Sequence, residues 1–548
     1  MAEVTPLLKK IHLFIAMTDE ELKRLAPQFE EVSFKAGEVV FNQGDVADAF
    51  YVIQSGKVDV IAIASLTGDR RKLATLVPGD YFGERGVVKG GARSATIQAV
   101  TDVTLFKLSR DHFHTFIGRN PRIKPHLQVA LQSRNYARSA NFKWLREEEV
   151  VYLVTLRHRI FLLQMLAIPS AVMSGMVLVM ALMLFLKLPA PWLVAPGILA
   201  LADLAWLRWN WADFHNDWYV VTNQRVVDID KIALIYDSRA EAPIQSVVNT
   251  AIKTTEWGRQ LSYGDVIVNT FSGPITFHDV PNPQATADMV LEQVNRSRGQ
   301  QRGMDRDALK NSVRQAMGLP VSAPPKKAEE KKEEPKRRGA LDSLLKSIDI
   351  KVREQKGDTI IYHKHVYVLL LNVGAPLAGF LAVIIIAVLR VFNVFPFPNL
   401  LITSLVALAL LLILGVATWY QYEDWKNDVY MVTNTQIFDI EHKPFGAEQR
   451  RAANLDAVQI VSFVRPSFIA NLLNYGTVTV NAGPGGEMKF FDVFDPLGVQ
   501  QDIYRRREVL NTNKSIAAAK QRHEEIGTYM SVFYEIMEEE RKKREGNK

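Results

Sequence analysis

Hydrophobic residues gather in four long runs that contain almost no charge. Residues 160–186, 366–389 and 400–420 carry no charged side chain, and residues 188–207 carry only Asp203. The first run would extend about 40 Å as a helix, and a bilayer core of roughly 30 Å needs about 20 residues. Soluble helices rarely reach such lengths without charge, so the pattern predicts four transmembrane helices.

The four runs form two pairs, each joined by a short proline-containing connection. An even number of spans places the remaining chain on one side of the membrane. Basic residues flank the runs mainly on that side, at Arg157, Arg159, Arg208, Lys364 and Lys426, against Lys187 and Arg390 on the other. The positive-inside rule therefore predicts a multi-pass protein of the inner (cytoplasmic) membrane, with its soluble domains and both termini in the cytoplasm.

Asp203 is the one acidic residue within a predicted span. A carboxylate at such a position is a functional-site hypothesis by default. It also precedes Arg208 by only five residues, so snorkelling to the interface or pairing with a basic neighbour is sufficient to explain it.

The second half of the chain repeats the first. The stretch 216–223, Asn-Asp-Trp-Tyr-Val-Val-Thr-Asn, recurs as Asn-Asp-Val-Tyr-Met-Val-Thr-Asn at 427–434, and Tyr263-Gly264 recurs as Tyr475-Gly476. Several matches in one order indicate a duplication. Each copy is a predicted hairpin followed by a soluble module.

Within each module the hydrophobic period is that of short strands separated by turn residues, and a helical pattern closes it at 285–294 and 497–510. This predicts two small β-barrel or sandwich modules, each capped by a helix. The Tyr-x-Val-Thr-Asn stretch at 219–223 and 430–434 resembles that of the bacterial pleckstrin-homology-like family found behind membrane hairpins. The resemblance implies membrane-associated scaffolding or assembly and identifies no ligand.

Two further segments differ in composition. A run of alternating charge at 326–338 predicts a flexible linker. Near the C-terminus Ile526, Met530, Phe533 and Met537 share one helical face, which predicts a docking or oligomerising helix. The resulting divisions are 10–147 for an N-terminal domain, 150–211 and 358–422 for the hairpins, 212–300 and 423–510 for the modules, 301–357 for the linker, and 511–548 for the C-terminal amphipathic helix and tail.

The N-terminal domain carries the only pattern with specific chemistry. Thr18 to Glu21 form a capping box that predicts a helix from Asp19, and short strands punctuated by glycines follow from residue 32. Phe82-Gly83-Glu84 then precedes Arg93-Ser94-Ala95-Thr96 by nine residues. A cyclic phosphate needs a fixed cation and backbone donors, and a ribose hydroxyl needs an acceptor. One arginine, one glutamate and a glycine turn at a helix start meet these needs.

These residues resemble the cyclic-nucleotide-binding domain of bacterial catabolite activators, kinase regulatory subunits and gated channels. The likeness extends through Gly37-Glu38, Gly44-Asp45, residues 49–53, Ser55-Gly56 and Pro78-Gly79-Asp80. It implies a β-roll with flanking helices, with a closing helix inside 120–147 that leads directly into the first hairpin. It also implies that Glu84 takes the ribose hydroxyl and Arg93 the cyclic phosphate, while Gly83, Ser94 and backbone near Gly86 complete the cradle.

Two positions depart from the family pattern, which usually has an aliphatic residue and then alanine after the glutamate. Here Arg85 and Gly86 follow. Arg85 either adds a phosphate contact or faces solvent, and Gly86 lowers helix propensity by roughly 1 kcal/mol relative to alanine. The alternative to nucleotide binding is a retained fold that no longer binds its ligand.

Composition narrows the remaining functions. The net charge is +7, which favours contact with the anionic lipids of the inner leaflet. The sequence contains no recognisable basic recognition helix, so we do not expect nucleic acid as a partner. The chain has no cysteine and shows no catalytic motif, so we expect no enzyme, no metal site and no cofactor. The expected ligand is cAMP or another cyclic mononucleotide, and the expected partners are the lipid bilayer and either further copies of the chain or another membrane protein. The alternatives are a membrane scaffold with a vestigial nucleotide domain and a ligand-gated channel or transporter.

Overall fold

The computed structural model describes residues 4–63, 70–139, 142, 144–146, 149–232, 235–271, 273–316, 353–392, 400–444, 446, 448–483 and 486–546. The chain divides into two compact units. The first comprises residues 1–233 and 239–299, and the second comprises residues 234–238 and 300–548.

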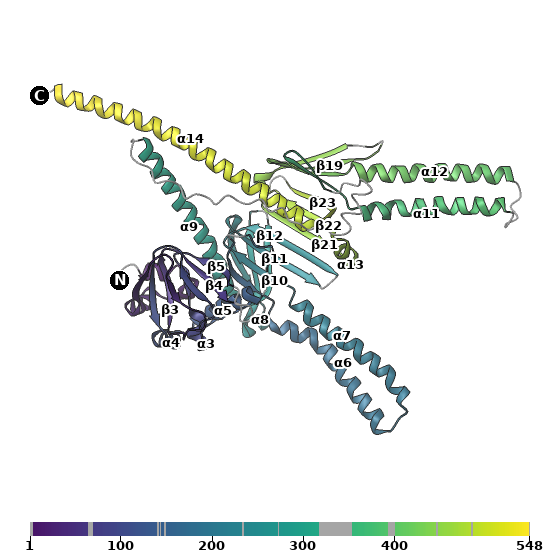
Figure 1. Ribbon diagram of the computed structural model, residues 1–548, viewed down its shortest axis with the longest axis horizontal. Helices are drawn as coiled ribbons and strands as arrows, with labels where there is room; N and C mark the ends of the chain where they lie inside the picture. The colour runs from purple at the N-terminus through teal and green to yellow at the C-terminus, as the bar shows by residue number, and fades with distance from the viewer. Residues whose placement is uncertain are drawn as a thin grey trace. The chain divides into compact units, whose positions relative to one another are not determined.

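The first unit begins with a β-roll surrounded by helices (Figure 1). Its strands form two sheets of order β1-β8-β3-β6 and β2-β7-β4-β5. The strands are β1 (Glu30–Phe34), β2 (Val39–Phe41), β3 (Ala49–Ser55), β4 (Val58–Ile63), β5 (Arg70–Leu76), β6 (Tyr81–Phe82), β7 (Thr96–Ala99) and β8 (Val103–Ser109). The helices are α1 (Val4–Leu8), α2 (Asp19–Leu25), α3 (Glu84–Lys89), α4 (Arg110–Arg119) and α5 (Ile123–Ser139). The predicted capping box is present, with Thr18 at the N-cap of α2.

Strand β3 explains why this domain is both a roll and a helical layer. Successive strand residues point to opposite faces, and residues 49–53 are all buried. Ala49, Tyr51 and Ile53 pack inside the roll, whereas Phe50 and Val52 pack against the helices. The continuous apolar run in the sequence therefore reflects one strand that serves two cores.

The rest of the first unit is a two-sheet module that contains the first hairpin. Its hydrogen-bonded strands follow the orders β12-β11-β10-β9 and β13-β14-β15. The elements are β9 (Val151–Thr155), α6 (Arg159–Phe185), α7 (Val194–Phe214), β10 (Trp218–Thr222), β11 (Arg225–Ile232), β12 (Tyr236–Pro243), β13 (Val247–Lys253), α8 (Glu256–Leu261), β14 (Tyr263–Thr270), β15 (Gly273–Pro281) and α9 (Pro283–Ala316).

Strand β9 corrects the predicted connection between the N-terminal domain and the membrane. The sequence predicted a helix within 120–147 that continues into the first hairpin, but α5 ends at Ser139. The chain then forms β9, which pairs antiparallel with β10 on the far side of the hairpin. The hairpin is thus inserted into the module's sheet and does not precede the module.

The second unit has a similar arrangement, with hydrogen-bonded strands in the orders β16-β17-β18-β19-β20 and β21-β22-β23. Strand β17 lies before the second hairpin and pairs with β18 after it. The elements are β16 (Arg353–Lys356), β17 (Thr359–His363), α11 (Val366–Val391), α12 (Leu400–Asn427), β18 (Val429–Val432), β19 (Gln436–His442), β20 (Glu448–Asn454), β21 (Ile460–Arg465), α13 (Phe468–Leu473), β22 (Tyr475–Asn481), β23 (Glu487–Phe494) and α14 (Pro496–Gly546).

The two copies agree in backbone detail as well as in order. Left-handed backbone occurs at matching positions, Ser262 and Asn474, Asp279 and Asp492, and Asn282 and Asp495. The sheets of each copy meet through one stacked aromatic pair, with ring centroids 4.8 Å apart for Tyr219 and Phe277 and 4.6 Å apart for Tyr430 and Phe490. The two stretches with similar sequence therefore agree in these backbone conformations and ring contacts.

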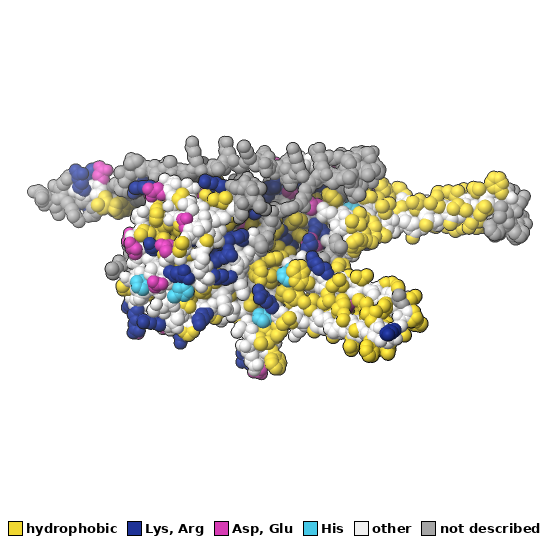
Figure 2. All heavy atoms as spheres, turned by 60° about the horizontal axis from the view of Figure 1, so that its bottom comes forward, with side chains coloured by type: hydrophobic (Ala, Val, Ile, Leu, Met, Phe, Trp, Pro, Cys, Tyr) yellow, Lys and Arg dark blue, Asp and Glu magenta, His cyan; other side chains and the backbone are white. Residues whose placement is uncertain are grey.

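Four helices among the described residues are long and apolar enough to cross a membrane: Arg159–Phe185, Pro191–Phe214, Val366–Arg390 and Leu401–Asn427. Figure 2 shows hydrophobic side chains covering the surfaces of the hairpins. Asp203 lies buried in the first hairpin, and neither of its carboxylate oxygens has a hydrogen-bond partner in the described part of the chain. Of the two explanations offered for it, pairing with a basic neighbour is therefore not seen among the described residues. The Arg208 guanidinium lies 4.7 Å from the Trp211 ring centroid.

Two predicted segments have different limits. The linker predicted at 301–357 is helical to Ala316, where α9 ends, and it contains β16 near its other end. The charged run at 326–338 lies outside the described residues. The C-terminal helix predicted from residue 511 is continuous with the module-capping helix, because α14 runs unbroken from Pro496 to Gly546. Phe533 and Met537 are about half exposed on it, and the side chains of Ile526 and Met530 are outside the described part.

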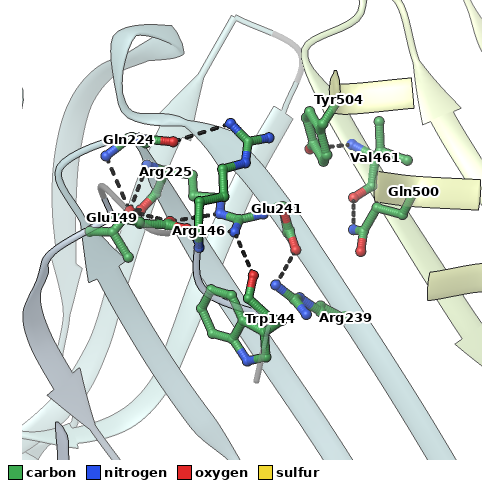
Figure 3. A network of polar contacts seen from close by, with 11 residues as sticks. Trp144, Arg146, Glu149, Gln224, Arg225, Arg239, Glu241, Val461, Gln500 and Tyr504 are labelled. Carbon is green, nitrogen blue, oxygen red and sulfur yellow. Dashed lines mark hydrogen bonds and ion pairs between the residues drawn. The ribbon is translucent and has the colours of Figure 1, made fainter. Parts of the chain in front are cut away.

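A buried charge network joins the N-terminal domain to the first module (Figure 3). Arg225 of β11 donates from Nε and Nη2 to both carboxylate oxygens of Glu149, at 2.8 and 2.7 Å. Its Nη1 donates to Glu241 of β12 at 2.6 Å, and Arg239 also pairs with Glu241. The Trp144 ring lies beside both guanidiniums, at 5.0 Å from Arg225 and 4.0 Å from Arg239. Because Glu149 precedes β9, the network anchors the segment that leaves the N-terminal domain.

We expect Arg225→Ala to destabilise the first unit by about 3–5 kcal/mol, because it leaves two buried carboxylates without their shared cation. Denaturation of the solubilised full chain would measure this loss. Arg259→Ala is the matched control, since its side chain is 66% exposed and pairs with Glu256 on the surface, where such pairs contribute up to about 1 kcal/mol. Equal effects of the two substitutions would contradict the importance of the network.

Candidate functional site

A cavity of about 230 Å³ opens beside the β-roll in the first unit. All six site residues predicted from the sequence line it: Gly83, Glu84, Arg85, Gly86, Arg93 and Ser94. Side chains from β5, α5, β9 and α9 complete its walls. The six residues selected from the sequence therefore line one cavity. The contributions of β5, β9 and α9 to its walls were not predicted.

Gly83 forms the turn that precedes α3 at the wall of the cavity. Its φ of 89° is left-handed, and it is the N-cap of α3, whose first residue is Glu84. A Cβ at Gly83 would lie 2.6 Å from Arg93 Nη1 and 2.9 Å from the Ala49 carbonyl oxygen. Only glycine fits both the backbone conformation and the space.

Arg93 is a buried cation at the cavity wall, with 3% of its surface exposed. Its Nη2 donates to Asp48 Oδ1 at 2.8 Å and its Nη1 to the Gly83 carbonyl at 3.3 Å. The guanidinium also lies 4.1 Å from the centre of the Phe41 ring. Nε is buried without a hydrogen-bond partner among the described residues. The group thus holds a fixed positive charge with one donor unused.

Glu84 is buried and paired with an arginine from the closing helix. Arg134 of α5 donates from Nη1 to Glu84 Oε2 at 2.6 Å and from Nη2 to the Tyr81 carbonyl at 2.8 Å. One turn later, Arg138 donates to Ser94 Oγ at 3.0 Å. Helix α5 therefore contacts both predicted binding segments. The spacing of four between the two arginines, within the predicted closing helix, is a signal that sequence reasoning could have used.

Helix α9 supplies a second, unpredicted set of contacts from outside the β-roll. Its Glu292 accepts from the His12 backbone N–H at 2.7 Å and lies 2.6 Å from His12 Nδ1. Arg296, one turn on, pairs with Asp80 and donates to the Gly79 carbonyl at 3.1 Å and to Glu292 at 2.8 Å. Asp80 and Gly79 form the turn that leads into the Tyr81–Glu84 segment.

The charge state of Glu292 follows from these neighbours. Burial by itself would raise the pKa of its carboxyl, but the interactions with His12 and Arg296 outweigh it and hold the pKa below its ordinary value. Glu292 is therefore ionised at neutral pH. The contact between α9 and the N-terminal domain is one of fixed charges.

Comparison with known proteins assigns this region. The family described as "Cyclic nucleotide-binding domain" matches residues 31–120. Residues 31–120 are a cyclic nucleotide-binding domain. The match covers only this part, so it does not describe the hairpins or the modules.

The relatives of the nucleotide-binding domain are regulators. The chain is 35% identical over 122 residues to the "Cyclic AMP receptor protein" of Thermus thermophilus, covering 22% of this chain and 56% of that protein. It is 32% identical over 111 residues to the "cAMP-dependent protein kinase regulatory subunit" of Emericella nidulans, covering 20% of this chain and 26% of the relative. The chain thus spans about half of the first relative and a quarter of the second.

Among solved structures, the catabolite activator protein of Thermus thermophilus is 34% identical. The match covers 23% of this chain and 59% of that one, with a TM-score of 0.22. The nucleotide-binding domain is therefore assigned from the sequence match and not from this TM-score.

The two departures from the family pattern have different structural settings. Arg85 is half-buried at the cavity wall. Burial, and then the charge of Arg85, lower the pKa of Arg138 from its ordinary value. Gly86 has a packing reason, since a Cβ there would lie 2.3 Å from the Cβ of Ala47. An alanine at position 86 is excluded by the alanine already present at position 47.

We expect Gly86→Ala to destabilise the nucleotide-binding domain by about 1–3 kcal/mol, despite its better helix propensity, because it overpacks a buried contact. The double substitution Ala47→Gly with Gly86→Ala is expected to recover most of that loss, since it moves one methyl group across the contact. Thermal unfolding of the wild type, both single variants and the double variant forms the complete cycle. Additive single effects would contradict the proposed contact.

Proposed function

We propose that this chain is a membrane-anchored sensor of a cyclic mononucleotide, and that it is a regulatory protein and not an enzyme. The observation that carries this proposal is the shared cavity. The residues expected to bind the nucleotide line it together with four side chains of α9, the helix that closes the first module. Ligand in this cavity lies between the sensor domain and the element that receives its signal.

The chemistry of the cavity supports a cyclic phosphate and a ribose as the recognised groups. Arg93 offers a fixed buried charge and one unused donor for the phosphate, and the start of α3 directs backbone N–H groups to the same place. Glu84 offers a carboxylate to a ribose hydroxyl, in exchange for its present pairing with Arg134. The names of the relatives favour cAMP among the cyclic mononucleotides.

Two contacts give the ligand a route to the first module. On α5, Ser133 Oγ accepts from the Val154 backbone N–H at 2.7 Å and donates to the Tyr152 carbonyl at 3.1 Å, which connects the closing helix to β9. On α9, Arg296 and Glu292 hold the turn and the histidine beside the cavity. A ligand that changes the position of α5 therefore changes the strain on β9, and β9 leads directly into α6. Such coupling requires only different ligand affinities in two conformations.

We place the hairpins in the inner membrane, with the nucleotide domain in the cytoplasm. The four apolar helices and the basic residues at their domain side support this placement. The two modules, each of two sheets and a helix, are proposed to be pleckstrin-homology-like units that act in assembly at the membrane, with further copies of the chain or another membrane protein.

We expect Arg93→Ala to weaken cyclic-nucleotide binding by about 30-fold or more, because loss of a buried charge partner typically costs about 2–5 kcal/mol. Calorimetry of the full chain in detergent with cAMP, cGMP, cCMP and cUMP would measure the affinity. Arg119→Ala on α4 is the matched control, since this arginine is exposed and lies outside the cavity.

The same titration separates the alternatives. Equal affinity of the Arg93→Ala variant and the wild type would contradict the site. No binding of any cyclic nucleotide by folded wild-type protein would favour a scaffold with a vestigial domain. Nucleotide-dependent ion flux in liposomes would instead favour a channel.

We expect Glu292→Gln to change nucleotide affinity by about 5-fold or more, because coupled sites typically interact by about 1–3 kcal/mol and the substitution removes the charge that faces His12 and Arg296. Glu256→Gln is the control, since its side chain is 81% exposed and is not part of the cavity lining. Hydrogen exchange of residues 283–299 with and without nucleotide gives an independent measurement. Unchanged affinity together with unchanged exchange would show that α9 does not receive the signal.

A further inference from the structure

Each module exposes apolar side chains on one short helix. On α8, Trp257 is 69% exposed and Leu261 is 42% exposed. On α13, Phe468, Ile469 and Leu472 are 50%, 41% and 70% exposed. Neither set belongs to a membrane-crossing helix or to a hydrophobic core of the described residues.

The two helices occupy the same position in the repeat. Each begins with a hydroxyl N-cap, Thr255 or Ser467, that accepts from the backbone N–H three residues later. Each buries one small residue, Gly258 or Ala470. The capped turn and the small residue fix the helix against its sheet. The exposed apolar residues are not needed for that attachment.

Both helices lie at the base of a hairpin. Tyr263, two residues after α8, packs edge-to-face on Phe161 in the first turn of α6, with ring centroids 5.2 Å apart. The first turn of α6 is also tied to the module by a hydrogen bond of 2.7 Å from His158 N to the Asp279 carbonyl.

The second unit places α13 in the same way. Tyr475, two residues after α13, packs on Tyr367 in the first turn of α11, at 5.5 Å between ring centroids. His365 N donates to the Asp492 carbonyl at 2.7 Å. In both units, therefore, the short helix is held beside the point where the apolar run begins.

We propose that α8 and α13 insert their exposed side chains into the interfacial layer of the bilayer that the hairpins cross. This inference rests on the proposed membrane location. A helix at the base of a spanning hairpin lies at head-group depth, and interfacial helices bury their apolar face about 5–10 Å into that boundary. Tryptophan in particular prefers this layer.

The chemistry of the two faces favours lipid over a protein partner. The matching positions hold Trp257 in one copy and Ile469 in the other, and Gln260 corresponds to Leu472. A protein pocket would require a defined shape, whereas a lipid surface accepts any apolar side chain. At the matching positions Trp257 and Ile469 both copies expose an apolar side chain, and the two side chains differ in shape.

Single-cysteine variants test this directly, because the natural chain has no cysteine. Trp257→Cys, Leu261→Cys and Leu472→Cys, each in the full chain in nanodiscs, would carry an environment-sensitive fluorophore. Arg259→Cys and Arg119→Cys are the controls. Arg259 lies on α8 about 160° from both Trp257 and Leu261 in helical projection, and Arg119 is exposed on α4 of the N-terminal domain. Ile168→Cys, about 13 Å along α6 from Arg159, marks the bilayer interior.

We expect the labels at 257, 261 and 472 to be quenched at least about two-fold more by a nitroxide near the lipid head group than by one at the chain end, as interfacial depth requires. The label at 168 should show the reverse order, and those at 259 and 119 should be quenched by neither. Nucleotide affinity of each labelled variant confirms folding.

The outcomes separate this inference from the proposed function. If the label at 168 is quenched while those at 257, 261 and 472 behave like the controls, the hairpin is in the bilayer and the interfacial proposal is overturned. Blue-shifted emission at 257 without lipid quenching would assign the face to a protein contact and overturn it as well. If the label at 168 also escapes quenching, the membrane location itself is wrong.

Discussion

The buried guanidinium of Arg225 is the constraint on which the first unit depends. A charge with so little exposure must be compensated, and the two carboxylates that compensate it come from different parts of the chain. Glu241 belongs to the module, but Glu149 belongs to the segment that leaves the nucleotide-binding domain. The module therefore completes its own charge balance only with that segment in place. Edge-to-face contacts of Trp218 with Tyr136 and Phe142 reinforce the junction. Sensor and module consequently form one folded unit.

This junction changes how a signal has to travel. A helix continuous with the first span would transmit rotation or translation directly to the membrane. In this structure the closing helix α5 contacts β9. Under the proposed function, the sheet that contains β9 would receive the change before the hairpin does. Helix α9, at the end of the same module, also contacts the nucleotide-binding domain, because Arg296 pairs with Asp80 in the turn before β6. The module thus contributes residues of β9 and α9 to the lining of the cavity. Under the proposed function, its conformation and the nucleotide affinity would depend on each other.

Much of this architecture could be predicted from local patterns. The resemblance of the motifs between Gly37 and Thr96 to the cyclic-nucleotide-binding family predicted the nucleotide domain, and uncharged runs predicted the hairpins. The repeated sequence predicted similar modules, and each module contains one corresponding stacked pair, Tyr219–Phe277 or Tyr430–Phe490. The pattern failed where partners are distant in the chain. The contact of Glu292 with His12 spans 280 residues and leaves no periodic signal. Strand β9 was missed because its five residues lie just before a long apolar run.

The insertion of each hairpin between paired strands has a consequence for biogenesis. Strands β9 and β10 can meet only after residues 156–217 have been synthesised, so the sheet closes a long loop whose entropic cost falls when its ends are already close. Packing of α6 against α7, including the bond from Asn210 Nδ2 to the Met165 carbonyl at 3.2 Å, brings those ends together. The hairpin thus acts as a template for the sheet that flanks it. In a chain whose hairpin failed to form, β9 would lack its partner β10, and its unpaired backbone groups would be open to pairing with other chains.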